Sequence, residues 1–440
     1  ATEDFNIQMK LELSGIGAVL TVEDGAAKIE KLMPGGPAAR SGKLAAGDKI
    51  VAVGQGPDAK DFEDILYQPL YKSVRIIRGK KGTTVRLKII PADDPSGSTT
   101  RIVKIVRDEI KLEDRAAKGE TREWDAPIKE DEAVKLGVIT LPDFYADMGG
   151  SRGKERRSSA KDVRMLVEGM VEEDVDGIVL DLRDNGGGSL QDAIIMSGLF
   201  INEGPIVQVK STRGTQALPD PDPSQLYDGP LVIMVNRHSA SASEILAAAM
   251  QDYNRAVIVG DTRTHGKGTV QSLLPIDRRN NKMGSLKLTT AGFYRVSGGS
   301  TQLKGVEPDI LVPSTLDALE IGEKFLPNHL EWSIVRRAKY SPYDDGLDAL
   351  LPELAKRSKQ RLAASEDYQN YAKQIDRLAQ YVARKELPLQ YDERLKMAEE
   401  DKESTDMQRD ALSGDSLLSD EEEEEEKKKN DHILKEGLAI

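Results

Sequence analysis

The segment Gly177–Gly188, GIVLDLRDNGGG, decides the fold of the central part of the chain. Its first half, Gly177–Leu182, is a short and mainly apolar run, which is typical of a strand buried on both faces of a parallel sheet. The glycines that follow Asn185 indicate a strand-to-helix turn, and Leu190–Phe200 has a helical pattern. A strand that passes through a tight turn into a helix predicts an α/β unit with right-handed crossovers.

Two more strands of the same kind follow. Leu231–Asn236 is apolar and precedes a predicted helix at Ser241–Asp252, and Ala256–Gly260 is again mainly apolar. We therefore expect residues 93–315 to form an α/β core around a largely parallel sheet. In such sheets the active site lies where the strands end and the loops begin, so the segments after these strands are the candidates for chemistry.

Residues 13–92 precede this core and predict a mainly β domain. Turn residues separate apolar or alternating runs, which are typical of short strands. These runs are Gly15–Leu20, Ala26–Leu32, Leu44–Val53 and Thr83–Ile90. A short helix is expected at Ala38–Gly42, and residues 1–12 are expected to be an N-terminal segment of the α/β core.

The last part of the sequence, residues 316–440, predicts a helical and charged region. Leu354–Arg384 is rich in Ala, Lys, Gln, Arg and Leu at helical spacing. The acidic run Asp420–Glu426, followed by lysines, is typical of a solvated helix or a disordered segment. The prediction is thus a β domain, an α/β core and a helical, charged C-terminal region.

Composition excludes several classes of function. A length of 440 residues suggests about two to four domains. The formal net charge of -13 argues against a general nucleic-acid binder, since phosphate binding needs clustered Lys and Arg. No apolar run is long enough to cross a bilayer, and the absence of cysteine excludes disulfides, thiol catalysis and thiolate metal sites. The polar start at Ala1 does not resemble a targeting signal, so we expect a removed targeting segment or a fragment.

The segment Ser239–Ile245, SASASEI, is the most informative one for chemistry. It follows a predicted buried strand and opens a helix, where backbone N–H groups suit the binding of an oxyanion. Its small residues would let a substrate carbonyl approach Ser241. The spacing from Ser241 to Glu244 equally predicts a capping box, in which both side chains satisfy helix N–H groups. This segment alone favours the capping box over a nucleophile.

The segment His265–Gln271, HGKGTVQ, places Lys267 between two glycines shortly after the third predicted strand. This framing lets the backbone pack closely and leaves the lysine as the only long side chain. A phosphate-binding loop is the competing interpretation, but that motif needs Ser or Thr directly after the lysine, where this chain has Gly268. We therefore reject a nucleotide-phosphate site.

The block at residues 13–92 resembles a PDZ domain. The resemblance lies in GIGA at 15–18, GGPAA at 35–39 and AGDKI at 46–50. Such a domain binds an extended peptide as an added strand, and backbone N–H groups of its glycine loop hold the terminal carboxylate. By this resemblance the peptide-binding residues are Gly15, Ile16, Gly17 and Ala18.

Four segments together resemble the family of tail-specific proteases, also called C-terminal processing peptidases. They are, in order, VLDLRDNGGG at 179–188, SASASEILAAAMQDY at 239–253, HGKGTVQ at 265–271 and AGFYRVSGGSTQLKGVEPDI at 291–310. The resemblance is closest to the bacterial periplasmic branch, and it covers residues 5–315 and, more loosely, the helical region. It implies an α/β protease core with a mainly β PDZ domain and a helical, charged C-terminal region.

The resemblance implies a Ser-Lys dyad. Ser241 would be the nucleophile, Lys267 its base, and Gln271 a support for the lysine. A free lysine has a pKa of about 10.4 and is charged at neutral pH, so it accepts no proton. A lysine base must therefore be held neutral by burial, at a cost of about 4 kcal/mol.

The oxyanion donors implied by the resemblance are backbone N–H groups. They belong to Ala242 and to the glycine turn, with Gly187 as the first choice and Gly188 as the second. The chain departs from the family pattern in the loop Asp261–His265, which is one residue longer than usual. In that loop His265 stands at a place that is more often aromatic.

The resemblance further implies a serine endopeptidase that recognises C-terminal tails of unfolded or tagged proteins. The expected partners are polypeptides with apolar C-termini. The resemblance is compatible with an additional adaptor protein, and no nucleic-acid partner is expected. No metal or organic cofactor is implied, and the expected location is the periplasm.

Two alternatives compete with the dyad. A serine–histidine peptidase would use His238 or His265, which both lie near the key segments in sequence, and histidine is the commoner base. A scaffold that binds peptides through its PDZ domain but has lost catalysis is the alternative from another class of function.

Overall fold

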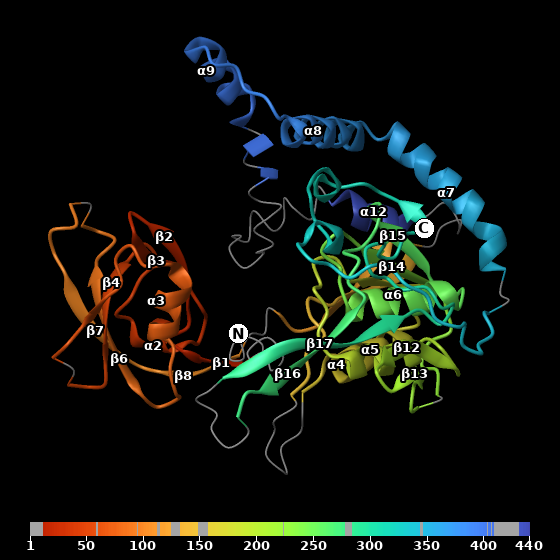
Figure 1. Cartoon of the computed structure of the whole chain (residues 1–440), viewed down its shortest axis with the longest axis horizontal. Coiled ribbons are helices and arrows are strands. Elements are labelled where there is room, and N and C mark those ends of the chain that lie inside the picture. The colour runs from red at the N-terminus through yellow and green to blue at the C-terminus, as the bar shows by residue number, and fades with distance from the viewer. Residues whose placement is uncertain are drawn as a thin grey trace. The chain divides into compact units, whose positions relative to one another are not determined.

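The computed structural model describes most of the chain (Figure 1). The described residues are 12–58, 60–94, 96–111, 115–124, 133–147, 157–222, 224–277, 284–343, 346–402, 404–405, 407–408 and 431–440. The acidic run Asp420–Glu426 and all but the last residue of the predicted segment 1–12 lie outside them. Two compact units are present, a small one that contains Leu11–Asp114 and a large one that contains Arg115–Asp415 and Glu421–Ile440.

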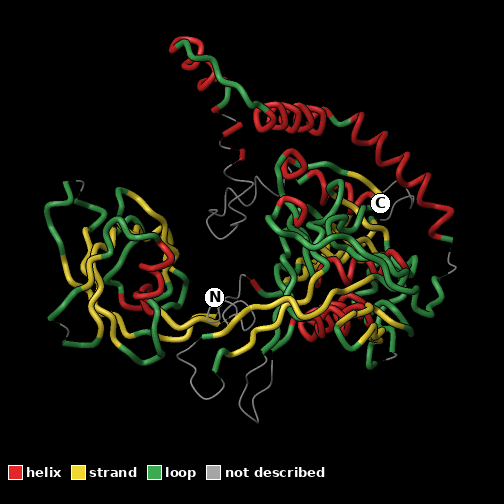
Figure 2. The backbone as a smooth tube through the Cα atoms, viewed as in Figure 1, coloured by secondary structure: helices red, strands yellow, loops and turns green. Residues whose placement is uncertain are grey.

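The small unit is built on one antiparallel sheet with the strand order β2-β3-β4-β6-β7. Its strands are β2 (Ala18–Glu23), β3 (Ala26–Leu32), β4 (Lys49–Gln55), β6 (Thr84–Ile90) and β7 (Arg101–Val106). The short β5 (Glu63–Asp64) also pairs with β4, while β1 (Glu12–Gly15) pairs with β8 (Asp108–Lys111). Two helices, α2 (Pro37–Ser41) and α3 (Leu70–Ile77), complete the unit, and Figure 2 shows them beside the strands.

Alternation of side chains explains the core of the small unit. Along β6, Val85, Leu87 and Ile89 are fully buried, while the residues between them are half-buried. Ile29 of β3 and Ile50 of β4 are fully buried in the same core. Each run predicted as a strand in this unit overlaps a strand, at β2, β3, β4 and β6, whereas β1, β5, β7, β8 and α3 were not predicted.

The large unit contains the expected parallel sheet. Its strand order is β18-β15-β14-β11-β10-β9, and all neighbours are parallel except β9, which runs antiparallel to β10. The strands are β9 (Lys118–Trp124), β10 (Val134–Thr140), β11 (Gly177–Asp181), β14 (Leu231–Val235), β15 (Val257–Gly260) and β18 (Ile310–Leu311). The three strands predicted from apolar runs are thus neighbours, because each run is buried on both faces of the sheet.

Helices cover both faces of this sheet. The helices α4 (Ser159–Glu172), α5 (Leu190–Gly198) and α6 (Ala242–Asp252) follow strands of the sheet as crossovers. The other face packs against α12 (His432–Ala439) and against Tyr368 of α8 (Glu366–Ala383). Figure 1 shows α12 beside β14 and β15. The last described residues of the chain therefore belong to the core of the large unit.

A second, antiparallel sheet lies in the same unit. Its order is β13-β12-β17-β16, and its strands are β12 (Pro205–Ser211), β13 (Gly214–Pro219), β16 (Thr269–Pro275) and β17 (Ser285–Tyr294). The strand β16 begins two residues after Lys267, so this sheet continues directly from the lysine segment.

The predicted helical stretch Leu354–Arg384 is helical but forms two helices. These are α7 (Leu347–Ala364) and α8, and Ser365 separates them by accepting a hydrogen bond from the N–H of Tyr368 as the N-cap of α8. A further helix, α9 (Tyr391–Glu400), follows, and short 3-10 turns lie at Thr315–Ala318 and Glu323–Phe325. In the part of the chain that the structure describes, no helix is both long enough and apolar enough to span a membrane.

Candidate active site

The parallel sheet brings the three chemical segments to one edge. The glycine turn follows β11, the serine segment follows β14 and the lysine segment follows β15. These three strands are adjacent and parallel, so their carboxyl ends lie together. This is the position at which open α/β sheets hold their active sites.

Ser241 has a strained backbone at the first turn of α6. Its φ is 58° and its ψ is -108°, a conformation that costs a residue other than glycine about 1–3 kcal/mol. An ordinary N-cap residue lies in the β region instead. A serine held on a sharp strand-to-helix turn is the arrangement by which α/β hydrolases expose a nucleophile. The strain therefore points to chemistry and not to helix capping alone.

Glu244 joins the serine and lysine segments. Its Oε2 accepts hydrogen bonds from the N–H of Ser241 at 2.7 Å and from the N–H of Lys267 at 3.0 Å. Its Oε1 accepts from the Oγ1 of Thr264 at 2.6 Å and from the N–H of Gly266 at 2.7 Å. The two residues predicted as a dyad are therefore held by one carboxylate oxygen. The Glu244 half of the predicted capping box, the bond from the N–H of Ser241, is present and accounts for only one of these four bonds.

The Glu244 carboxylate is fully buried. Burial raises its pKa to about 7, against the opposite effect of the hydrogen bonds from Thr264, Ser241, Gly266 and Lys267. The sequence reasoning missed this role, because the Ser-x-x-Glu spacing indicates the bond to Ser241 and no local pattern reveals the bonds to residues 264–267.

Lys267 has the electrostatic environment that a base needs. Burial lowers the pKa of its amine, and the nearby charge of Lys287 lowers it further, while Glu323 and Glu244 act in the opposite direction. Gly268 explains the tight framing, since a Cβ there would lie 2.5 Å from the Oγ of Ser300. The direction of the pKa shift is the one expected for a lysine that accepts a proton near neutral pH.

The glycine turn approaches the serine closely. A Cβ on Gly187, whose φ is 99°, would lie 2.8 Å from the Cβ of Ser241 and 2.9 Å from the backbone N of Ala242. The N–H of Gly187 donates to the Oδ1 of Asn185 at 2.9 Å. An oxyanion at the N–H of Gly187 would therefore have to compete with the side-chain oxygen of Asn185.

Gln271 lies in β16 and is exposed. It pairs with Thr289 of β17 directly after a register shift at Val270. The two histidines of the competing interpretation make other contacts. The Nδ1 of His238 lies 2.9 Å from the Oδ1 of Asp184, and the Nε2 of His265 lies 3.8 Å from the Oε2 of Glu323.

The predicted peptide-binding loop, Gly15–Ala18, lies at the start of β2 in the small unit. Its carbonyl groups are engaged, since Ile16 accepts from the N–H of Ala38 at 2.7 Å and Gly17 accepts from the N–H of Met33 at 3.0 Å. Among the described strands β2 lies at the end of its sheet order, so one of its edges is unpaired there, and α3 packs near this strand. An unpaired strand edge is the feature to which a PDZ domain adds a peptide strand.

Among the described side chains, no group of three or more His, Asp or Glu residues is arranged to hold a metal ion. The groups that follow the carboxyl ends of β11, β14 and β15 include a serine, a lysine and backbone N–H groups. They are suited to acyl transfer through a covalent intermediate.

Comparison with known proteins identifies the family. Family models match the chain as a PDZ domain at 5–90, as peptidase family S41 at 135–312 and as the C-terminal domain of tail specific protease at 316–440. A carboxy-terminal-processing protease of Bartonella bacilliformis is 32% identical over 343 residues, which are 75% of this chain and 69% of that protein. The chain belongs to the tail-specific protease family. The predicted fold class, an α/β protease core with a PDZ domain and a helical C-terminal region, is confirmed.

Other members of the tail-specific protease family are also similar. The tail-specific protease of Haemophilus influenzae is 42% identical over 343 residues, which are 77% of this chain and 46% of that protein, so the chain spans about half the length of this relative. A solved PDZ domain of a carboxy-terminal protease from Vibrio cholerae, in complex with peptide, is 40% identical and covers 23% of this chain and 99% of that chain, with a TM-score of 0.21.

Proposed function

We propose that this chain is a serine endopeptidase of the C-terminal processing type that works through a Ser241–Lys267 dyad. The observation that carries this proposal is that one carboxylate oxygen of Glu244, Oε2, accepts hydrogen bonds from the backbone N–H groups of both Ser241 and Lys267. The strained backbone of Ser241 and the lowered pKa of Lys267 support it independently. Membership of the tail-specific protease family supports the reaction class.

The reaction follows from these groups. The Oγ of Ser241 attacks the scissile carbonyl carbon while its proton passes to the neutral Nζ of Lys267. The N–H groups of Ala242 and of the glycine turn, from Gly188 or Gly187, stabilise the oxyanion. The Lys267 ammonium then protonates the leaving amine, and the C–N bond breaks. Water, deprotonated by the same lysine, hydrolyses the acyl-enzyme and restores the Ser241 hydroxyl.

We assign Gln271 to the support of Lys267. In an extended strand, side chains four positions apart point to the same side but lie about 13 Å apart at their Cα atoms. Lys267 lies two residues before β16 begins, so only part of the backbone between it and Gln271 is held in extended strand pairing. Two long side chains then span the remaining distance, with the Gln271 carbonyl oxygen accepting from the lysine amine.

We also propose that the small unit captures substrates by their C-termini. In the described part of the chain, the N–H groups of Ile16 and Gly17 donate to no protein acceptor, so they are available to a terminal carboxylate. The edge of β2 would pair with the substrate backbone, and the expected tail is apolar and belongs to an unfolded or tagged protein. A periplasmic location and an adaptor protein are proposals that rest on the family.

Activity is expected to rise with pH through the neutral range. Lys267 accepts a proton only when its amine is neutral, and its lowered pKa brings this state toward neutral pH. Glu244, with a pKa of about 7, accepts four bonds only when ionised. Measurements of kcat on a short peptide between about pH 5 and pH 9 should therefore show that kcat decreases as the pH is lowered below neutral.

Protonation of Glu244 at low pH does not unfold the protein, so unfolding through Glu244 does not explain the expected decrease of kcat at low pH. The folded-state pKa of Glu244 is raised, so the stability that it contributes is fully present at low pH and is lost as pH rises through about 7. The effect of Glu244 on stability thus runs opposite to its effect on activity. A kcat that stays level or falls from acid to neutral pH would contradict the assignment of Lys267 as base.

A PDZ-dependent preference for apolar tails tests substrate capture. A Cβ on Gly17, whose φ is 74°, would lie 3.1 Å from the Cα of Gly36, so Gly17→Val should distort the loop. We expect wild type to cleave an unfolded protein with an apolar tail at least about tenfold more efficiently than the same protein with an acidic tail. Gly17→Val should remove this preference and leave a short peptide unaffected. Equal cleavage of both tails by wild type would contradict tail recognition.

A further inference from the structure

The helix α12 is anchored at its start by Asp431. The Oδ1 of Asp431 accepts the N–H of Leu434 at 2.9 Å and so caps the helix. Along the helix, Ile433, Leu434 and Leu438 are buried against the parallel sheet. Gly437 packs so tightly that a Cβ there would lie 2.9 Å from the Sδ of Met234 in β14. The start of α12 therefore occupies a fixed place on the sheet.

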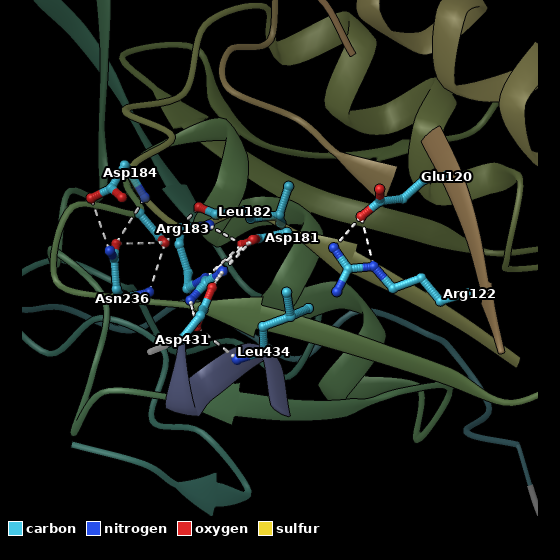
Figure 3. A network of polar contacts seen from close by, with 10 residues as sticks. Glu120, Arg122, Asp181, Leu182, Arg183, Asp184, Asn236, Asp431 and Leu434 are labelled. Carbon is cyan, nitrogen blue, oxygen red and sulfur yellow. Dashed lines mark hydrogen bonds and ion pairs between the residues drawn. The ribbon is translucent and has the colours of Figure 1, made fainter. Parts of the chain in front are cut away.

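Arg183 connects this helix start to the strand that leads into the glycine turn (Figure 3). Its Nη1 donates to the Oδ1 of Asp431 at 2.6 Å and its Nη2 to the Oδ2 at 2.7 Å. Its Nε and Nη2 also donate to Asp181, the last residue of β11, at 2.9 Å and 2.6 Å. The guanidinium is thus clamped between two carboxylates, and only 16% of its side chain is exposed.

Electrostatics keep this clamp charged. The charges of Asp181 and Asp431 raise the pKa of Arg183 although burial acts in the opposite direction. For Asp431, burial raises the pKa but the charge and hydrogen bonds of Arg183 outweigh it and lower the pKa. A bidentate pair of this kind fixes direction as well as distance, because the planar guanidinium matches the carboxylate geometry.

The residues directly after Arg183 form the active-site turn. The N–H of Asp184 donates to the Oδ1 of Asn236 at 3.0 Å, as Figure 3 also shows. The Oδ1 of Asn185 accepts a hydrogen bond from the N–H of Gly187. The backbone carbonyl oxygen of Asn185 accepts one from the N–H of Ala240 at 3.0 Å. The orientation of Arg183 therefore sets the start of a turn whose later residues contact the serine segment.

We propose that Asp431 is a positioning residue for catalysis. Docking of α12 holds Arg183 through Asp431, and Arg183 in turn holds residues 184–188 in the conformation that presents backbone N–H groups beside Ser241. This inference rests on the proposed peptidase function. It assigns to residues 431–440 a role in the rate of the chemical step in addition to their packing on the sheet.

The competing explanation is that α12 only completes the hydrophobic core, and the chain offers a matched control. At the other end of α12, buried Glu436 pairs with Arg361 of α7, with an Nε–Oε1 distance of 3.1 Å. Glu436→Gln weakens the docking of the same helix without touching Arg183. Asp431→Ser removes one of the two carboxylate partners of Arg183 but keeps an N-cap residue, because serine caps helices as well as aspartate does.

The kinetic test compares the full-length chain and these variants on a short fluorogenic peptide. We expect Asp431→Ser to lower kcat at least about tenfold with KM within about twofold, since a misplaced oxyanion donor weakens transition-state binding alone. Asp431→Asn, which keeps one acceptor oxygen, should restore part of the loss. Glu436→Gln should keep kcat within about twofold of wild type. A loss of kcat no larger in Asp431→Ser than in Glu436→Gln would overturn the proposal.

Amide hydrogen exchange gives a second readout that does not depend on cleavage. Exchange over residues 183–189 should become faster in Asp431→Ser and stay at the wild-type rate in Glu436→Gln. Wild-type rates in both variants would overturn the coupling even if kcat fell. Failure of wild type to cleave the peptide would instead reject the proposed function, and the exchange comparison would still decide whether α12 holds the turn.

Discussion

Replacing Lys267 by Ala is expected to lower kcat on a short peptide by about a thousandfold or more, with folding retained. Removal of a member of a nucleophile–base pair leaves only binding and oxyanion stabilisation, so the effect on the chemical step is large. The backbone N–H of residue 267 remains bound to Glu244 in this variant, so the loop should keep its position. Steady-state kinetics with Ser241→Ala as a parallel variant measures the effect, and both variants should fall to the same residual rate.

The histidines provide the control for this prediction. His265→Ala and His238→Ala should each keep kcat within about tenfold of wild type, because their contacts are with Glu323 and Asp184. A Lys267→Ala variant that still cleaves, together with an inactive His265→Ala or His238→Ala variant, would replace the dyad by a serine–histidine mechanism. Persistence of substrate with wild type and Ser241→Ala alike would favour the non-catalytic scaffold.

Replacing Glu244 by Gln is expected to lower kcat by about a hundredfold, although Glu244 does not contact the substrate in the mechanism proposed above. The carboxylate accepts bonds from four donors, two on each oxygen. A glutamine side chain has an acceptor on one side only, so its NH₂ group would face two of these donors in a buried site. The bonds to Ser241 and Lys267 share one oxygen, so an amide nitrogen there would loosen both members of the dyad together.

Asp309 offers a matched control for this substitution. It is a half-buried carboxylate directly before β18, away from the carboxyl ends of the strands, and it accepts bonds from the N–H of Ile258 in β15 at 2.8 Å and from the Nε2 of Gln251 at 2.9 Å. Asp309→Asn should lower the melting temperature without lowering kcat of the folded fraction. Glu244→Gln should lower kcat beyond any loss of folded protein, and an equal kcat for the two variants would exclude a special role for Glu244.

Particular residues illustrate how far local pattern reached. Apolar runs at Gly177–Leu182, Leu231–Asn236 and Ala256–Gly260 correctly predicted three neighbouring strands, because a strand buried on both faces must be apolar at every position. The stretch Leu354–Arg384 correctly predicted helix but not its interruption at Ser365, since capping serines also occur inside polar helical patterns. The helix α3 was missed although its residues are strongly amphipathic, because eight residues are fewer than the window over which helical periodicity is judged.

The sequence by itself determined the order of the motifs and the parallel sheet, because strand and helix formation follow from the spacing of apolar and turn residues. The residues of the proposed chemistry were named through the resemblance to the tail-specific proteases. Only the tertiary structure decided what joins them. The carboxylate of Glu244 reaches the lysine segment 20 to 23 positions away, and Arg183 reaches Asp431 across 248 positions. Such contacts depend on which strands become neighbours and on the strained φ of Ser241. They arise from long-range packing and leave no periodic signal in the chain.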